Sequence, residues 1–358
     1  MQMSVTLDWL IDAAAEIDDA DRFLAGLAAR LVAEGLPVAG AALSLKVAHP
    51  LIARRAWLWR ADNGEVIEAL GFALPGAGDA AHRDERLWLE KIAPGRVCED
   101  RVGRAPEGPW LAWVAPRDFS AAEAARLRQA ARFAAAPLAA LTARATLAAT
   151  LEAYLGRRSA AQALAAPLRR VVGENIEAAL LFADLRGFTA LSENQPPEEV
   201  IAALDAWFDR IAGAIHAYGG EVLKFIGDGL LAIFPVAGGS ARPVCAAALS
   251  AVSAARAGMA RLNQERQARG LPELSFGAAL HLGGVHWGNI GAANRLDFTA
   301  IGPAVNLASR LEGLCKPLGR SALVSGALAA QVDAPLVPLG RHQLRGIALP
   351  CAVYALPD

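Results

Sequence analysis

Five polar residues in the second half of the chain have the types and separations that a site for a metal ion and a nucleotide requires. They are Asp184, Lys224, Asp228, Asn306 and Arg310. They fall in three short strings, which are FADLRGFT at 182–189, KFIGDG at 224–229 and LDFTAIGPAVNLASR at 296–310. Carboxylate oxygens are the ligands that Mg²⁺ and Mn²⁺ prefer, so the two aspartates are the candidate metal ligands. Paired cations could activate a hydroxyl and neutralise a departing pyrophosphate.

Both aspartates are expected at turns. Asp184 follows an apolar run at 178–183, and Gly187 allows the chain to turn sharply after it. The backbone amides of 185–189 could then face an anion. Asp228 lies between two glycines, which predicts the tip of a hairpin. Taken singly, each aspartate is more typical of an ordinary cap or turn residue, so the interpretation depends on the order and spacing of the three strings.

Lys224 must act apart from the metal ligands. It lies four residues before Asp228 on one predicted strand, and at about 3.3 Å per residue the two are about 13 Å apart. Lys224 is therefore expected to be solvated, to form an ion pair, or to contact a different part of a large ligand.

Asn306 and Arg310 are four residues apart in a predicted helix, so they share one face. Such a pair suits recognition of ribose and phosphate, because arginine offers fixed donors to phosphate oxygens. The alternative is a solvated helix face on which Arg310 pairs with Glu312 or Asp297.

The elements that position these residues occupy 176–358. Apolar periodicity predicts a central strand at 178–183, a helix at 196–218 and a hairpin of 221–226 with 230–234. The remaining predicted elements are a helix at 242–268, strands at 274–282, 285–290 and 296–301, and a helix from Pro303. This pattern favours an α+β domain with a mostly antiparallel sheet and flanking helices.

Residues 1–118 read as a smaller mixed α/β domain. Trp57 and Trp59 fall at alternate positions, as on one face of a strand, and Asn63-Gly64 is a hairpin turn signal. The arrangement is analogous to GAF-like or PAS-like sensor domains, and no residue identifies a ligand, so the sensor ligand or partner is unknown. The tryptophans are more typical of a core than of a cofactor site.

Residues 119–175 are interpreted as a helical signalling linker. Ser120 and Glu123 fit a capping box, and Pro137 should kink or split the helix. A 4-3 spacing of apolar residues predicts either a seam between two protomers or a helix packed on its own domain. Those residues are Leu127, Ala131, Ala134, Leu138, Leu141 and Ala145.

Composition argues against several classes of protein. The 35 basic and 36 acidic residues nearly cancel, which speaks against nucleic acid as the main partner. The first ten residues lack the pattern of a secretion signal, and the longest uncharged stretch contains five glycines, so we expect a soluble, cytoplasmic protein with no membrane span. Four scattered cysteines indicate neither a zinc site nor disulfides.

The region 176–356 resembles the catalytic domain of class III nucleotide cyclases, the adenylyl and guanylyl cyclases, because all three strings occur in that family's order. The resemblance implies a ferredoxin-like or palm-type fold and two Mg²⁺ or Mn²⁺ ions held by Asp184 and Asp228. It implies that Lys224 and Thr299 select the purine and that Asn306 orients the ribose. The other implied substrate contacts are Arg310, Phe188, Thr189 and, in place of the family's late phosphate-binding lysine, Arg345.

The resemblance also implies a reaction and an assembly. The ribose 3′-oxygen of ATP would attack the α-phosphorus to give 3′,5′-cyclic AMP and pyrophosphate. In that family the metal aspartates come from one protomer and the base, ribose and arginine contacts come from the other, so a chain with every role implies a homodimer.

Base choice follows from two positions. Lys224 can donate to adenine N1, whereas guanine N1–H would prefer a carboxylate. Thr299 replaces an aspartate common in the family, resembles a bacterial subgroup associated with bicarbonate stimulation, and keeps GTP or a pyrimidine triphosphate open as substrates. Asp297 is either a supplementary base contact or, more typically, the ion-pair partner of Arg295. The alternative from a different class of function is a catalytically silent regulatory module. Loss of either aspartate, of Asn306 or of Arg310 would favour it, but all four residues are present.

Overall fold

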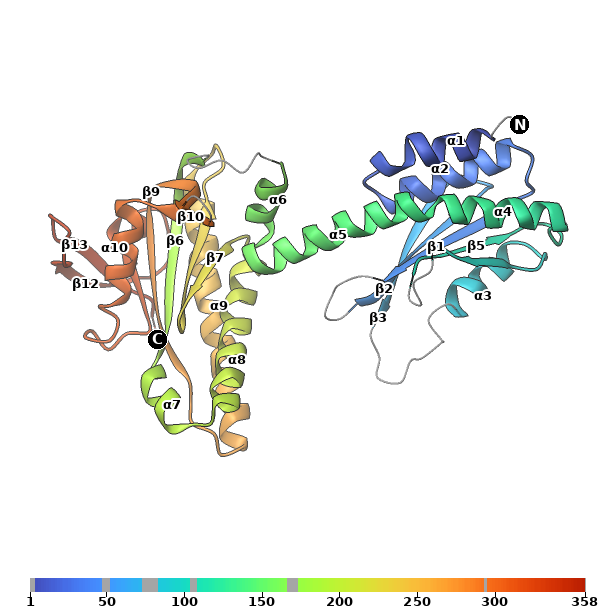
Figure 1. The fold of residues 1–358 in the computed structure, drawn as a ribbon. Helices are drawn as coiled ribbons and strands as arrows, with labels where there is room; N and C mark the ends of the chain where they lie inside the picture. Colours follow the sequence, from blue (N-terminus) through green and yellow to red (C-terminus); the bar gives the residue numbers. More distant parts are fainter. Residues whose placement is uncertain are drawn as a thin grey trace. The chain divides into compact units, whose positions relative to one another are not determined.

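The computed structural model describes residues 4–46, 52–72, 83–103, 108–165, 173–292 and 295–357. The chain divides into two compact units, Met1–Leu151 and Glu152–Asp358, each of which is described by itself (Figure 1). The prediction that Asp297 pairs with Arg295 falls on a side chain outside the described part.

Unit 1 is built on a five-stranded antiparallel sheet in the order β3-β2-β1-β5-β4. The strands are β1 (Gly40–Lys46), β2 (Ile52–Arg60), β3 (Val66–Phe72), β4 (Cys98–Arg101) and β5 (Trp110–Val114). The helices are α1 (Val5–Asp12), α2 (Ala20–Ala33), α3 (Arg83–Ile92), α4 (Ala121–Phe133) and α5 (Ala135–Leu155). The predicted turn at Asn63-Gly64 joins β2 to β3, with Gly64 at φ 71°.

The two faces of this sheet carry different helices. Side chains of α1, α2, α4 and α5 pack on one face around Trp113 and Phe23, and α3 packs on the other face through Leu89. The capping box of Ser120 and Glu123 is present, and the helix bends by 43° between α4 and α5, three residues before Pro137. Within unit 1, the seam residues from Leu127 to Leu141 are buried in the unit's own core, whereas Ala145 is exposed.

Unit 2 contains a larger sheet in the order β12-β13-β11-β9-β6-β8-β7, with β10 paired to β9. The strands are β6 (Gly173–Arg186), β7 (Glu221–Ile226), β8 (Gly229–Pro235), β9 (Ser275–Ala292), β10 (Arg295–Ile301), β11 (Ala322–Ser325), β12 (Val337–His342) and β13 (Cys351–Ala355). The helices are α6 (Arg157–Ala165), α7 (Phe188–Asn194), α8 (Pro197–Ala217), α9 (Ala241–Ala268), α10 (Pro303–Glu312) and α11 (Gly326–Ala329). All pairings are antiparallel except β11 with β9, so the expected α+β class with a mostly antiparallel sheet is confirmed.

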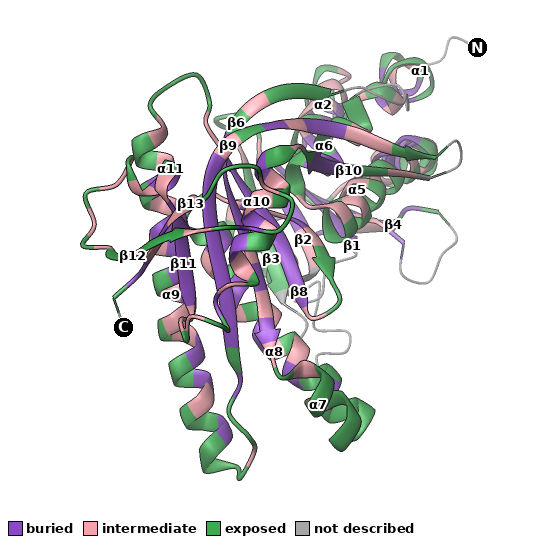
Figure 2. Ribbon diagram, turned by 90° about the vertical axis from the view of Figure 1, so that its left-hand side faces the viewer, coloured by how far each residue is buried: buried purple, intermediate pink, exposed green. Residues whose placement is uncertain are grey.

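Strand alternation sorts the core of unit 2 into layers. Odd residues of β6, such as Leu181, pack against α8 and α9, and even residues, such as Leu180, face α10. Figure 2 shows much of β9 buried, and the burial pattern of β6 places its buried residues between Ala178 and Leu185, with exposed positions on the outer helices. Helix α9 is long and apolar enough to cross a membrane by composition, as are α4 and α5 taken together. In unit 2, however, α9 packs on the sheet as a core helix.

One predicted break in the sheet is wrong. The strands expected at 274–282 and 285–290 form a single strand, β9, which continues through Gly283 and Gly284. Both glycines keep their pairing with β6, opposite Ala178 and Glu177. A Cβ at position 283 would lie 2.7 Å from Cβ of Ala304, so this glycine allows α10 to approach the sheet closely and does not mark a turn.

Candidate active site

The two candidate metal ligands lie side by side at one end of the sheet. Asp184 near the end of β6 pairs in register with Gly229, and the amide of Leu185 donates to the carbonyl of Asp228 over 3.3 Å. A Cβ at position 229 would lie 2.8 Å from Oδ1 of Asp184, so only glycine lets the hairpin approach this closely. Trp207 of α8 fixes the turn by donating from Nε1 to the same Asp228 carbonyl over 3.1 Å.

The electrostatics of this pair favour a cation. Burial raises the pKa of Asp184, and the adjacent Asp228 carboxylate raises it further, while Arg186 opposes both effects. Among the described residues no group of three or more His, Cys, Asp and Glu side chains could hold a metal ion. A cation bound here would therefore have two carboxylate ligands and positions left for phosphate oxygens and water, which is the arrangement that Mg²⁺ adopts with nucleotides.

An ion pair that was not predicted from the sequence adjoins the aspartates. Arg186, two residues after Asp184 on the same face of β6, lies 3.6 Å from Glu312 at the end of α10. Burial raises the pKa of Glu312 while Arg186 lowers it. The signal was available in the i, i+2 spacing of Asp184 and Arg186, because alternate strand residues share a face.

Lys224 lies apart from the aspartates, as its position on the strand predicts. It is opposite Leu231 in β8, which places it on the face of the sheet that α10 covers. Its ammonium forms an ion pair with Asp297 of β10, a partner that was not predicted for either residue. Asp297 remains 53% exposed at its side chain and can still reach a ligand.

Thr299 lies two residues after Asp297 on the same strand face. Its side chain is buried, and its Oγ1 has no hydrogen-bond partner among the described residues. A buried hydroxyl without a partner costs roughly 1–3 kcal/mol. Such an atom is therefore a good candidate for a ligand contact.

Asn306 and Arg310 both lie on the exposed side of α10. The alternative pairings of Arg310 are not formed, because Glu312 bonds to Arg186 and Asp297 bonds to Lys224. Residues two apart in a helix point about 200° away from each other. Because Glu312 faces its own Asp184 end of β6, Arg310 points away from the aspartates of its own chain.

The remaining predicted contacts are less closely gathered. Phe188 opens α7 and is half-buried against the core of unit 2, and Thr189 is exposed beside it. Arg345 is exposed in the turn between β12 and β13. The structure brings neither Thr189 nor Arg345 into contact with the other candidates within the described part of one chain. His281 is buried against Ser325 Oγ at 2.8 Å, as a core histidine would be.

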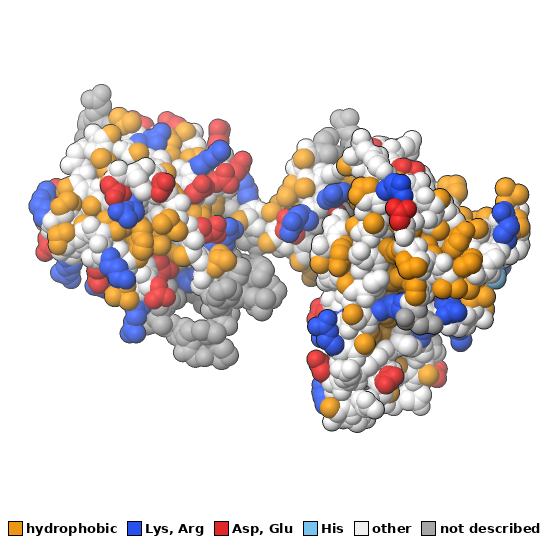
Figure 3. All heavy atoms as spheres, turned by 180° about the vertical axis from the view of Figure 1, so that it is seen from behind, with side chains coloured by type: hydrophobic (Ala, Val, Ile, Leu, Met, Phe, Trp, Pro, Cys, Tyr) orange, Lys and Arg blue, Asp and Glu red, His pale blue; other side chains and the backbone are white. Residues whose placement is uncertain are grey.

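Exposed apolar side chains flank the site. Phe225 and Ile226 end β7, Ile301 ends β10, and each is about half exposed. Figure 3 shows one face of unit 2 on which hydrophobic side chains predominate over charged ones. Elsewhere on this view acidic and basic groups are interspersed, in keeping with the near-zero net charge.

Residues 172–327 match the family model described as the adenylate and guanylate cyclase catalytic domain. Adenylate cyclase 1 of Rhizobium meliloti (strain 1021) is 37% identical over 183 residues, which are 50% of this chain and 27% of that protein. Adenylate cyclase of Anabaena cylindrica is 35% identical over 160 residues, which are 44% of this chain and 31% of that protein. The chain thus spans less than a third of the length of these relatives.

A solved structure of a bacterial light-regulated adenylyl cyclase matches with a TM-score of 0.52 and 18% identity, over 88% of this chain and 93% of that one. At this identity the likeness shows a shared fold. The cyclase-type fold expected from the three strings is therefore confirmed.

Proposed function

We propose that this chain, whose residues 172–327 are a catalytic domain of the adenylate and guanylate cyclase type, converts ATP to 3′,5′-cyclic AMP and pyrophosphate. The observation that carries the proposal is the side-by-side placement of Asp184 and Asp228 at the β6 end and the β7–β8 turn. The fit to divalent cations rests on the donor set, because two adjacent carboxylates repel each other until a cation binds.

The residues of the chain divide the work. Cations held by Asp184 and Asp228 would activate the ribose 3′-hydroxyl and neutralise the pyrophosphate. Asn306 orients the ribose, and Arg310 donates to the phosphate oxygens on which negative charge develops. No covalent enzyme intermediate is required, so positioning and electrostatic stabilisation supply the rate enhancement.

Base recognition belongs to the cluster of Lys224, Asp297 and Thr299. The ion pair with Asp297 holds the lysine ammonium in place, so that it can donate to adenine N1. The unpartnered hydroxyl of Thr299 can accept from the adenine amino group. GTP is the second candidate, and the exposed Asp297 carboxylate is the observation that favours it, because guanine N1–H is a donor.

We also propose a homodimer in which each site uses both protomers. Arg310 points away from its own aspartates, and the exposed apolar residues beside Lys224 and Asp228 provide surface for a second copy. Unit 1 would regulate the assembly through α5, which runs from unit 1 past Leu151. We also propose a cytoplasmic location.

The decisive experiment offers each of the four ribonucleoside triphosphates with Mn²⁺ to the full chain and identifies the products by mass. We expect cyclic AMP from ATP at a rate that exceeds the other three reactions. Absence of any cyclic product would refute the enzyme proposal, and preferred turnover of GTP would assign Asp297 the guanine role.

The composite site has its own test. Asp228→Ala and Arg310→Ala chains should each be inactive alone, and their mixture should regain activity because one site in the mixed dimer is intact. Exchange of subunits is verified by native mass spectrometry. Verified mixed dimers without activity would contradict the two-protomer site while leaving the metal assignment in place.

A further inference from the structure

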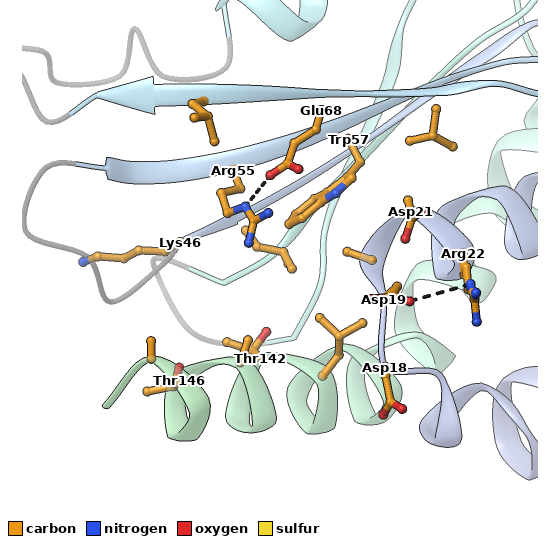
Figure 4. A pocket seen from close by; sticks show the side chains of 17 residues that line it. Asp18, Asp19, Asp21, Arg22, Lys46, Arg55, Trp57, Glu68, Thr142 and Thr146 are labelled. Atoms are coloured by element: carbon orange, nitrogen blue, oxygen red, sulfur yellow. Dashed lines mark hydrogen bonds and ion pairs between the residues drawn. The ribbon is translucent and has the colours of Figure 1, made fainter. Parts of the chain in front are cut away.

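Unit 1 contains a cavity of about 940 Å³ (Figure 4). It lies between helix α5 and the face of the sheet on which α1, α2 and α4 also pack. The β2–β3 edge of the sheet, α5 and the segment that opens α2 form its walls. All three belong to unit 1, so the cavity is independent of the candidate active site. Its volume falls in the range of about 300–1,000 Å³ that is typical of small-molecule sites.

The cavity exists because α5 presents small side chains to the sheet. Thr142, Ala145, Thr146 and Ala149 follow the i, i+3, i+4, i+7 spacing of one helix face. One turn earlier, Leu138 and Leu141 occupy the same layer and are buried. Leucine side chains are long enough to fill the space between a helix and a sheet, whereas alanine side chains leave part of it empty.

The sheet side of the cavity combines an aromatic surface with an ion pair. Trp57 is only 7% exposed, and Leu45 and Val66 extend its apolar surface. Arg55 and Glu68 form an ion pair across β2 and β3, and Figure 4 shows both projecting into the cavity beside Trp57. The Arg55 guanidinium lies 5.3 Å from the centre of the Trp57 ring. The Arg55–Glu68 ion pair therefore lies on the same face of the sheet as the apolar core of unit 1.

The ion pair leaves hydrogen-bonding capacity toward the cavity. The bond joins Nε of Arg55 to Oε1 of Glu68, so among the described residues the terminal nitrogens and the second carboxylate oxygen remain for a ligand. They present donors next to an acceptor. On the opposite wall, Oγ1 of Thr142 is buried without a hydrogen-bond partner among the described residues. A polar occupant that reached this hydroxyl could supply the missing bond.

Charges around the cavity balance. The charged lining residues are Asp18, Asp19, Asp21 and Glu68 against Arg22, Lys46 and Arg55. Arg144 of α5 pairs with Asp18 at 3.2 Å and makes the two signs equal, four to four. Among the described residues around the cavity neither sign is in excess, which favours a neutral occupant.

We propose that this cavity binds a neutral, planar heteroaromatic molecule whose edge carries an N–H donor beside a carbonyl acceptor. Arg55 donates to the carbonyl, Glu68 accepts from the N–H, and the ring packs on Trp57. Thr142 completes the site from α5, so the ligand contacts the helix that continues past unit 1. The walls come from one unit and include a polar floor, which suits a small molecule better than an apolar segment of a second copy.

The test uses the full chain and three bicyclic probes of similar size but different charge, which are 2-quinolone (neutral), 2-naphthoate (anionic) and 2-naphthamidine (cationic). Ligand-observed NMR titration measures each affinity. We expect saturable binding of 2-quinolone and at least tenfold weaker binding of both charged probes. No saturable binding of 2-quinolone, or equal binding of a charged probe, overturns the proposal.

Variants locate the site. Both Ala143 and Ala145 are exposed, but of the two only Ala145 lines the cavity. Ala145→Leu narrows the cavity and should weaken 2-quinolone binding at least tenfold, whereas Ala143→Leu should leave it unchanged. Glu68→Gln, which alters no buried apolar contact, should also weaken binding about tenfold. Unchanged affinity in both Ala145→Leu and Glu68→Gln overturns the site. If Ala145→Leu instead shifts the monomer–dimer equilibrium in sedimentation while 2-quinolone binds nowhere, the groove is a protomer contact and the proposal fails.

Discussion

The two sheets of this chain place their polar side chains differently. In unit 2 the candidate catalytic groups lie where strands end, with Asp184 near the end of β6 and Asp228 in the turn before β8. In unit 1 the polar groups Arg55 and Glu68 lie within strands, on the face that packs against helices. The first arrangement leaves the core of the sheet intact, and the second is possible only where the core is interrupted by a cavity.

This difference separates two ways of building a site. A strand-end site depends on specific residues, such as an aspartate next to the glycine that lets the neighbouring strand approach. A face cavity depends on missing volume, such as the alanines and threonines of α5. Changes at the first site should therefore alter chemistry with little effect on folding, and changes at the second should alter packing with little effect on chemistry.

The largest expected effect tests the strand-end site. Asp228→Ala removes one of two adjacent carboxylates and should lower kcat by roughly 10³-fold or more, because electrostatic contacts to the reacting groups are lost. Binding of 2-quinolone to unit 1 should be unchanged. The matched control is Asp333→Ala, whose carboxylate is 89% exposed and pairs with Arg242. Retained cyclase activity in Asp228→Ala would remove the metal assignment.

A buried histidine gives unit 2 a pH response of its own. Burial lowers the pKa of His281 from 6.5 to about 4. Because the unfolded chain takes up a proton at higher pH than the folded one, stability is lost as the pH falls from 6.5 toward 4, by about 3 kcal/mol in total. Urea unfolding of unit 2 at pH 7, 5.5 and 4.5 should show this loss.

The comparison with His281→Asn isolates the histidine, because Asp184 and Glu312 titrate in both proteins. The variant should lose distinctly less stability over the same interval. Parallel pH curves for the two proteins would mean that His281 is not the group responsible.

The strand-end site was predictable from sequence, because its chemistry depends on residue types in short strings. Asp184, Asp228 and the hairpin between β7 and β8 could be located from apolar runs and glycines. The partners could not, since Glu312 meets Arg186 and Asp297 meets Lys224 only through the tertiary fold. The Gly283-Gly284 pair misled the prediction because close helix packing and a turn select the same residue type.

The cavity was not predictable for a related reason. Small residues on α5 produce no signal by themselves, and the 4-3 spacing that includes Ala145 suggested a protomer seam or simple packing. Only the position of the sheet opposite reveals that the same alanine borders empty space. Arg55 and Glu68 are 13 positions apart in the sequence, and only the pairing of β2 with β3 brings them together.

A smaller effect is expected at Thr299, where a candidate substrate contact is also a buried part of the fold. Thr299 lies at the base-recognition cluster but is also buried and unpartnered. Thr299→Val keeps the shape and removes the hydroxyl, so it should stabilise the free protein by about 1 kcal/mol while lowering kcat/KM for ATP about tenfold. Hydrogen exchange of β10 amides and steady-state kinetics measure the two effects. A fall in stability would show that the hydroxyl already has a partner in the free protein.

The smallest expected effect concerns the volume of the unit 1 cavity. Ala145→Leu adds three carbons at an exposed position that lines the cavity together with Trp57 and Leu141, and covering part of that apolar surface should stabilise unit 1 by about 1 kcal/mol. Ala143→Leu adds the same carbons at an exposed position that does not line the cavity, and it should change stability by less than about 0.5 kcal/mol. Native-state hydrogen exchange of β2 and α5 amides reports the difference for unit 1 alone. Equal exchange in the two variants would mean that the cavity closes in solution. The sheet of unit 1 would then be packed on this face as fully as the sheet of unit 2, and the contrast between them would be lost.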